Sequence, residues 1–152
     1  MKWFTDMMTN PLLLISLSSW FIAQILKVFI NAAVNKEWSL ERLFGDGGMP
    51  SGHSATVASL AAGSALIYGT GSFQFAVTTI LAIIVCHDAM GVRLETGKQA
   101  IVINELVASL LDTKKLPEIK LKEFVGHTPI QVIAGILIGI LNAVALYYWV
   151  FI

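Results

Sequence analysis

The sequence predicts an all-α fold: a polytopic bundle of four transmembrane helices plus one amphipathic interfacial helix. Hydrophobic residues make up 56% of the 152 residues, charged residues make up 13%, and the mean hydropathy is +0.74. A soluble domain carries about 25% charged residues, so this composition excludes a soluble domain, a disordered chain, a coiled coil and a basic nucleic-acid-binding module. We therefore expect one membrane-embedded domain over residues 1–152, surrounded by membrane lipids and without a nucleic-acid partner.

Long stretches without Asp, Glu, Lys or Arg locate the spans. Residues 47–86 and 128–152 form two such stretches, and Lys27 alone interrupts a third over residues 11–34. A spanning helix needs roughly 20 apolar residues, and about 17 is the lower limit. The central stretch is long enough for two spans, and Gly69-Thr70-Gly71-Ser72 is the natural turn between them. The expected spans cover about residues 11–34, 51–68, 72–92 and 128–152.

Residues 98–112 form a different pattern. Apolar side chains recur there at helical spacing on one face, namely Ile103, Leu106, Val107, Leu110 and Leu111. The segment is too short and too polar to span a bilayer. It is expected to be an amphipathic helix that either lies in the membrane interface or packs against another helix or subunit.

Four spans place both termini and the 69–72 turn on one side of the membrane. The other side then collects residues 35–50 and 93–127, which hold eight of the ten basic residues. Because basic loops stay in the cytoplasm, we expect a multi-pass protein of the cell membrane with this basic side facing the cytoplasm.

Two histidines occupy matching positions on that side. His53 lies in GGMPSGHSA at the start of the second span, and His127 lies in GHTPIQV at the start of the fourth. Ser51 and Thr128 are the expected N-caps. Helix N-termini favour bound phosphate, and a histidine beside a phosphate attacks phosphorus or protonates a leaving oxygen. Each histidine alone has an ordinary alternative as a hydrated cap, but the matching pair favours a site.

Two cations are candidates for the same site. Lys27 lies inside the first span, where it either binds a ligand or extends to the interface. Arg93 follows the third span, and Asp88 precedes it by about one turn. Asp88 either orients Arg93 or a histidine for function, or forms a purely structural ion pair with Arg93.

The blocks GGMPSGHSA, DAMGVRLETGKQA and GHTPIQVIAG closely resemble a divergent branch of the type 2 phosphatidic acid phosphatase and vanadium haloperoxidase-related superfamily. The resemblance runs from about Gln24 to Gly139. It implies that His53 is the general acid, that His127 is the nucleophile forming a phosphohistidine, and that Ser51 and Gly52 bind phosphate oxygens. It also implies chemistry without a metal or another cofactor.

The chain departs from the superfamily pattern at three places. Val34 and Asn35 stand where an Arg-Pro pair follows the first-signature lysine, Leu121 stands where the third signature has an arginine, and Gln131 stands where it has an aspartate. Arg93 is the candidate replacement for an arginine, and Asp88 or Glu105 for the carboxylate.

The superfamily core has more helices than this chain provides, which makes a homo-oligomer a candidate state. Small residues at Gly135 and Gly139, and at Ser59 and Gly63, permit close helix contacts either within one chain or between chains.

The preferred hypothesis is a metal-independent phosphatase acting on a lipid phosphate or pyrophosphate, with Lys27 and Arg93 binding the phosphate. A second hypothesis is a catalytically weak or inactive protein that binds phospholipid or polyprenyl-phosphate head groups, because the usual Asp and Arg are missing. A third is a metal-dependent hydrolase using His53, His87, Asp88 and His127. The single cysteine, Cys86, excludes an internal disulfide framework and a cysteine-based zinc site.

Overall fold

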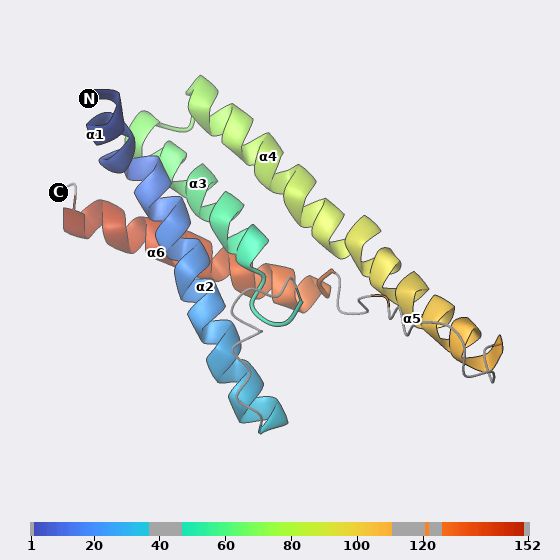
Figure 1. Ribbon diagram of the computed structural model, residues 1–152. Coiled ribbons are helices and arrows are strands. Elements are labelled where there is room, and N and C mark those ends of the chain that lie inside the picture. Colours follow the sequence, from blue (N-terminus) through green and yellow to red (C-terminus); the bar gives the residue numbers. More distant parts are fainter. Residues whose placement is uncertain (1, 37–46, 111–120, 122–125, 151–152) are drawn as a thin grey trace.

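The computed structural model describes residues 2–36, 47–110, 121 and 126–150 (Figure 1). In this part of the chain all regular structure is helical, which confirms the predicted all-α class. The helices are α1 (Lys2–Met8), α2 (Pro11–Asn35), α3 (Gly52–Tyr68), α4 (Phe73–Met90), α5 (Val92–Leu110) and α6 (Pro129–Val150).

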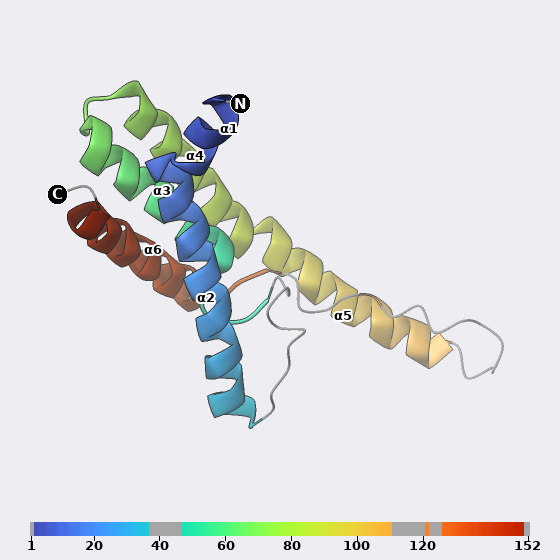
Figure 2. The ribbon, with the colours of Figure 1, turned by 60° about the vertical axis from the view of Figure 1, so that its left-hand side comes forward.

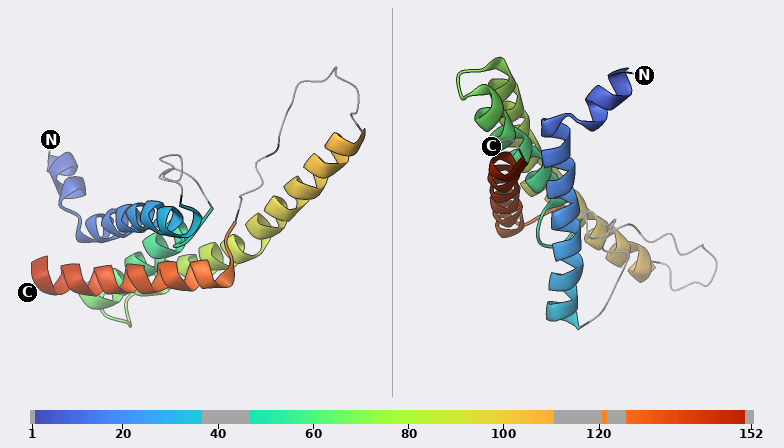
Figure 3. Two further views of the ribbon diagram at one scale, coloured as in Figure 1. Left: turned by 90° about the horizontal axis from the view of Figure 1, so that it is seen from below. Right: turned by 90° about the vertical axis from the view of Figure 1, so that its left-hand side faces the viewer.

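Helix α3 lies at the centre of the bundle and packs against α6, α2 and α4 (Figures 1 and 2). The N-terminal helix α1, the α3–α4 turn and the end of α6 gather at one end of the bundle (Figure 3). The opposite end brings together the start of α3, the α4–α5 junction and the start of α6. The two histidine-bearing segments predicted to lie on one side therefore do lie at one end of the fold.

Local capping explains where the helices begin. Asn10 Oδ1 accepts hydrogen bonds from the backbone N–H groups of Leu12 (3.0 Å) and Leu13 (3.2 Å), and Pro11 occupies the first position of α2. Ser51 Oγ accepts from the Ser54 N–H at 3.3 Å and caps α3, as predicted. Ser72 Oγ accepts from the Phe75 N–H at 3.1 Å, so the predicted turn at residues 69–72 is also confirmed.

The α3–α6 interface depends on glycine. A Cβ atom at Gly135 would collide with the Ser51 carbonyl oxygen, and one at Gly139 would collide with the Ala55 carbonyl oxygen. The backbones therefore approach each other more closely than any side chain would allow. This contact lies within one chain, which decides the alternative left open for Gly135 and Gly139.

A polar cluster joins α6 to α2 at a second point. The Asn142 side-chain N–H₂ group donates to Ser18 Oγ (2.9 Å), to Ser19 Oγ (2.8 Å) and to the Ile15 carbonyl oxygen (3.3 Å). Ser19 and Ile15 are fully buried. Because polar groups between membrane helices are costly unless they are paired, this cluster fixes α2 against α6.

Three helical segments are long and apolar enough to cross a membrane: Pro11–Val34, Phe73–Ala108 and Pro129–Val150. The predicted count of four spans is not confirmed, because α3, whose 17 residues are at the lower limit for a span, is not among these segments. Its buried face includes Ser54, Ser59 and Ser64. Neighbouring helices rather than lipid surround α3, so a central helix need not match the length and hydropathy of a lipid-facing span.

The amphipathic helix predicted over residues 98–112 differs from the observed one. Helix α5 begins at Val92, directly after Gly91, because helical hydrogen bonds continue on both sides of this glycine (Gly91 N–H to the His87 carbonyl, Glu95 N–H to the Gly91 carbonyl). Residues 111 and 112 lie outside the described part. The helix projects from the bundle along the direction of α4 (Figure 2).

The apolar face predicted for this helix does not pack against the rest of the described chain. Ile103, Leu106 and Val107 are 45%, 54% and 42% exposed, whereas the buried residues of α5 between Val92 and Ala108 are the small Gly97 and Ala100. Periodicity predicted an apolar side of the helix, but it could not show whether protein covers that side. A location in the interface or against a second subunit stays a prediction.

We expect Gly139→Ala to lower the free energy of unfolding by about 1–3 kcal/mol, because the new methyl group must push the α3 backbone away. Unfolding of the purified protein in detergent micelles measures this. Gly71→Ala is the matched control, since a Cβ there would meet nothing within 4 Å. Equal stability of the two variants would contradict the close α3–α6 contact.

Candidate functional site

The candidate site lies where the first turns of α3 and α6 meet the α4–α5 junction. The Ser51 N–H donates to the Gln131 carbonyl oxygen at 3.0 Å, and the His127 N–H donates to the Ala89 carbonyl oxygen at 3.0 Å. Gly126 adopts a φ of +100°, and a Cβ at this position would collide with the Arg93–Leu94 backbone. The segment leading into α6 is therefore held against the α4–α5 junction twice, by the hydrogen bond of His127 to Ala89 and by the close backbone contact of Gly126. These two contacts fix the position of His127.

The two predicted histidines come together at this point. The ring centroids of His53 and His127 are 6.4 Å apart, and the ring planes are inclined by 58°. His127 is only 2% exposed, whereas His53 is half-buried. A half-buried ring facing a buried one suits a proton donor that reaches solvent beside a nucleophile that does not.

Lys27 reaches the same site from α2. The residue is 3% exposed, and its side-chain carbons lie 3.4 and 3.5 Å from the Cβ position of Gly48, in the segment before α3. The positive charge of Lys27 lowers the pKa of His127. Lys27 is therefore buried beside the histidines rather than extended to the interface, which is the alternative that the sequence had left open.

Gln131 supplies an orientation for His127 that the sequence reasoning missed. Its Oε1 atom accepts a hydrogen bond from the Thr128 N–H at 3.1 Å and lies 3.3 Å from His127 Nδ1. Since a backbone N–H is always a donor, the amide atom facing it must be the oxygen. This oxygen accepts from Nδ1 when the neutral ring carries its proton there, and in that tautomer the lone pair lies on Nε2.

The contact between Gln131 and the Thr128 N–H is one half of a capping box, with Thr128 directly before the first residue of α6. Thr128 was expected to cap the helix with its own side chain, but it is the Gln131 side chain that reaches back to the Thr128 N–H. The signal was present as a spacing, because Thr128 and Gln131 have the T-x-x-Q pattern of a capping box.

Burial keeps His127 neutral. Desolvation is the main cause that lowers the pKa of His127 below its ordinary value of 6.5, and the charges of Lys27 and His53 lower it further. Hydrogen bonding to Gln131 and to the Gly48 backbone acts in the opposite direction without overcoming burial. The contribution of this group to stability is therefore present above pH 6.5 and is lost as the pH falls below it.

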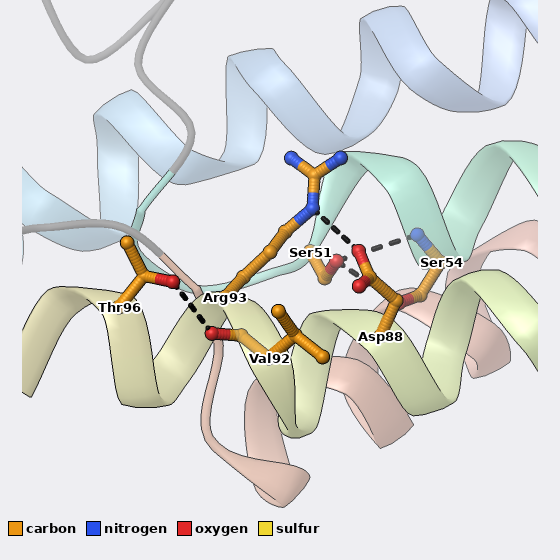
Figure 4. A network of polar contacts seen from close by, with 6 residues as sticks. All are labelled: Ser51, Ser54, Asp88, Val92, Arg93 and Thr96. Carbon is orange, nitrogen blue, oxygen red and sulfur yellow. Dashed lines mark hydrogen bonds and ion pairs between the residues drawn. The ribbon is translucent and has the colours of Figure 1, made fainter.

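Arg93 and Asp88 form an ion pair at the edge of the site. Arg93 Nε donates to Asp88 Oδ2 at 2.7 Å, and both side chains are partly exposed, at 44% and 41%. Figure 4 shows the terminal nitrogens of Arg93 pointing away from Asp88, and among the described residues they have no hydrogen-bond partner. Asp88 thus orients Arg93 rather than a histidine.

Two further sequence hypotheses gain no support: Glu105 as the replacement for the missing carboxylate, and a metal-dependent site. Glu105 is exposed on α5, where it makes no described contact with His127, and His87 is exposed on α4. No three His, Cys, Asp or Glu side chains within the described ranges come close enough together to hold a metal ion. At Leu121, where the superfamily has an arginine, the backbone pairs with the Asn104 side chain at 2.9 and 3.0 Å.

A buried histidine and a half-buried one lie together at two helix N-termini of a membrane helix bundle, the arrangement expected of a phosphatase-related membrane protein. Residues 8–142 match the model of the divergent PAP2 family, and the chain belongs to that family. An uncharacterised membrane protein of Bacillus subtilis (strain 168), YuiD, is 43% identical to this chain over an alignment of 157 residues. The alignment covers 95% of this chain and 98% of that protein. No solved structure matches the chain.

Nuclear magnetic resonance of ¹⁵N-labelled histidine tests the orientation of His127. We expect wild-type His127 to carry its proton on Nδ1 when neutral and to titrate below pH 6.5. Gln131→Leu should remove the preference for this tautomer, and Gln131→Glu should raise the pKa of His127 because a carboxylate stabilises the imidazolium. The signal is assigned by its loss in His127→Asn. A wild-type ring protonated on Nε2 would contradict the assignment.

Proposed function

We propose that this protein is a metal-independent phosphatase that hydrolyses a lipid phosphate or pyrophosphate through a phosphohistidine intermediate. The observation that carries the proposal is the buried, neutral ring of His127, oriented through Nδ1 by Gln131 and lying beside Lys27 and His53. A neutral imidazole with a free Nε2 lone pair is the nucleophilic form of histidine. Membership in the divergent PAP2 family supports the same class of chemistry.

In the proposed reaction, His127 Nε2 attacks phosphorus and the bond to the leaving oxygen breaks. His53 donates a proton to that oxygen, so the alcohol departs neutral. Water then attacks the phosphohistidine, with His53 taking a proton from it, and phosphate and the free imidazole are released. Lys27, Arg93 and the N-terminus of α3 at Ser51 and Gly52 stabilise the negative charge on the phosphoryl oxygens.

A second candidate function rests on Gln131. A neutral amide orients His127 but does not stabilise the positive charge that the ring acquires when it is phosphorylated. A site of this kind is also suited to holding a phosphate head group without turning it over. The same assay separates the two functions, because a binding protein shows saturable binding without steady phosphate release.

Phosphate release from a panel of lipid phosphates, by purified protein in mixed micelles, tests the proposal. His127→Asn should reduce the rate to background, and His87→Asn should leave it unchanged because His87 is exposed on α4. Chelators should have no effect. Wild-type activity in His127→Asn, or activity lost on chelation and restored by a metal, would overturn the proposed mechanism.

The role of His53 is tested through the leaving group. His53→Asn should slow release from an alkyl phosphate by about 10²–10⁴-fold, because an alkoxide needs a proton as it departs. A phenyl phosphate with an electron-withdrawing ring leaves without that proton, so its hydrolysis should be affected far less. Equal losses for both substrates would show that His53 does not act as the general acid.

We also propose that the site faces the cytoplasm, because the loops at this end of the chain carry most of its basic residues. Cysteines placed at Lys36 and Gly71 lie at opposite ends of the bundle and are both exposed. Cys86 is buried and is replaced by alanine to lower the background. In whole cells an impermeant thiol reagent should label position 71 and spare position 36, and the reverse pattern would place the site outside.

A further inference from the structure

A buried amide on α2 faces the first residue of α3. Gln24 is 5% exposed, and its Oε1 atom has no hydrogen-bond partner in the described part of the chain. The same atom lies 3.5 Å from the Cβ position of Gly52, the residue with which α3 begins. The amide is therefore directed at the helix N-terminus that is proposed to bind phosphate.

Two more unused polar groups lie at the same place. The Trp20 indole nitrogen is 3.6 Å from the Cβ position of Gly52, and no described residue accepts from it. In the first turn of α3, the N–H groups of Ser51, Ser54 and Ala55 all have acceptors, whereas that of Gly52 has none among the described residues. A neutral cluster of Gln24, Trp20 and Gly52 thus has hydrogen-bonding capacity that the protein itself leaves unused.

A buried side-chain oxygen without a hydrogen-bond partner, such as Gln24 Oε1, is unfavourable in a membrane helix bundle. Burial of an unpaired polar group costs free energy, and such groups are rare in folded proteins. Ser64 Oγ and Thr79 Oγ1 are also buried without partners, but a hydroxyl on a helix can rotate towards its own backbone carbonyls. The longer amide of Gln24 is held away from its own helix, towards Gly52, so a ligand is the natural source of its partner.

The face of α2 that carries these residues changes steadily in polarity. Lys27, Gln24 and Trp20 recur at helical spacing, and Trp20 lies about 10 Å from Lys27 along the axis at 1.5 Å per residue. Exposed Leu17 and Leu13 follow further along the helix. The order is cation, neutral amide, indole, then aliphatic side chains, which matches an amphiphile with its phosphate at Lys27 and its chain along α2.

We infer that Gln24 and Trp20 form a second subsite that binds a hydroxyl group on the linker between the phosphate and the hydrophobic chain of a lipid phosphate, with the hydroxyl donating to Gln24 Oε1. A lipid phosphate with a free hydroxyl on its linker fills this subsite, and a polyprenyl or simple alkyl phosphate does not. The inference rests on the proposed function only for the place of the phosphate, because binding at Gln24 requires no turnover.

Two non-hydrolysable probes test the subsite: a long-chain alkylphosphonate, and the same molecule with a hydroxyl at the carbon equivalent to the central carbon of glycerol. The wild-type protein should bind the hydroxylated probe about tenfold more tightly, the value of roughly one hydrogen bond. Gln24→Met should abolish this preference and leave binding of the plain probe unchanged. Ser64→Ala, which removes another unpartnered buried group, should keep the full preference.

Gln24→Met conserves volume and removes an unpaired polar atom, so we expect its thermal stability in micelles to equal or exceed that of wild type. If this variant does not fold, Trp20→Phe, which removes the indole N–H together with the five-membered part of the ring, should reduce the preference. A wild-type protein without preference, or a preference that survives in a folded Gln24→Met protein, overturns the subsite. If the protein binds both probes with the expected preference but hydrolyses no lipid phosphate, the proposed enzyme is refuted and the subsite stands. If the protein binds neither probe, the enzyme and the subsite are both refuted.

Discussion

The close backbone contact between α3 and α6 is the constraint on which the site depends. Gly135 allows the Ser51 carbonyl to approach α6, and the Ser51 N–H donates to the Gln131 carbonyl at 3.0 Å. The N-terminus of α3 therefore cannot move independently of the first turn of α6. His53 and His127, which follow Ser51 and precede Gln131 along the chain, come to lie with ring centroids 6.4 Å apart because these two backbones meet. A side chain larger than hydrogen at Gly135 or Gly139 would push α3 away from α6 and separate the two halves of the site.

Burial gives this junction its chemical character. Desolvation keeps His127 neutral, and Lys27 adds a positive charge close to the ring in a region shielded from water. A neutral imidazole beside a buried cation at a helix N-terminus favours an anion as the ligand and keeps the nucleophile in its reactive form. Gln131 contacts Nδ1 of the ring without contributing charge, which distinguishes this divergent PAP2 protein from the superfamily pattern with aspartate.

Features that depend on local sequence could be predicted. The first span, the Ser51 cap and the turn at residues 69–72 follow from apolar runs and short-range hydrogen bonds, and the structure has them. Spans entering from the same side also brought His53 and His127 to one end. Features that depend on neighbouring elements could not be predicted in the same way. Whether Gly139 contacts its own chain, and whether protein covers the apolar face of α5, are decided by tertiary packing.

The site shows the same division. Lys27 was a candidate from its charge within a span, but its burial against Gly48 depends on a loop distant in sequence. The role of Gln131 was missed because the superfamily pattern directs attention to an absent carboxylate rather than to the amide in its place. Gln24 carries no charge and lies in an apolar span, so only its unpartnered oxygen beside Gly52 marks it.

The covalent intermediate is the most direct test of the chemistry at this junction. Purified protein is mixed with a lipid phosphate labelled with ³²P, quenched rapidly in alkali and digested, because phosphohistidine survives alkali and is labile in acid. Alkali-stable label on the peptide that contains His127, absent from His127→Asn, is the predicted result. Steady release of phosphate without label on His127 at any time before the steady state would contradict nucleophilic attack by this residue.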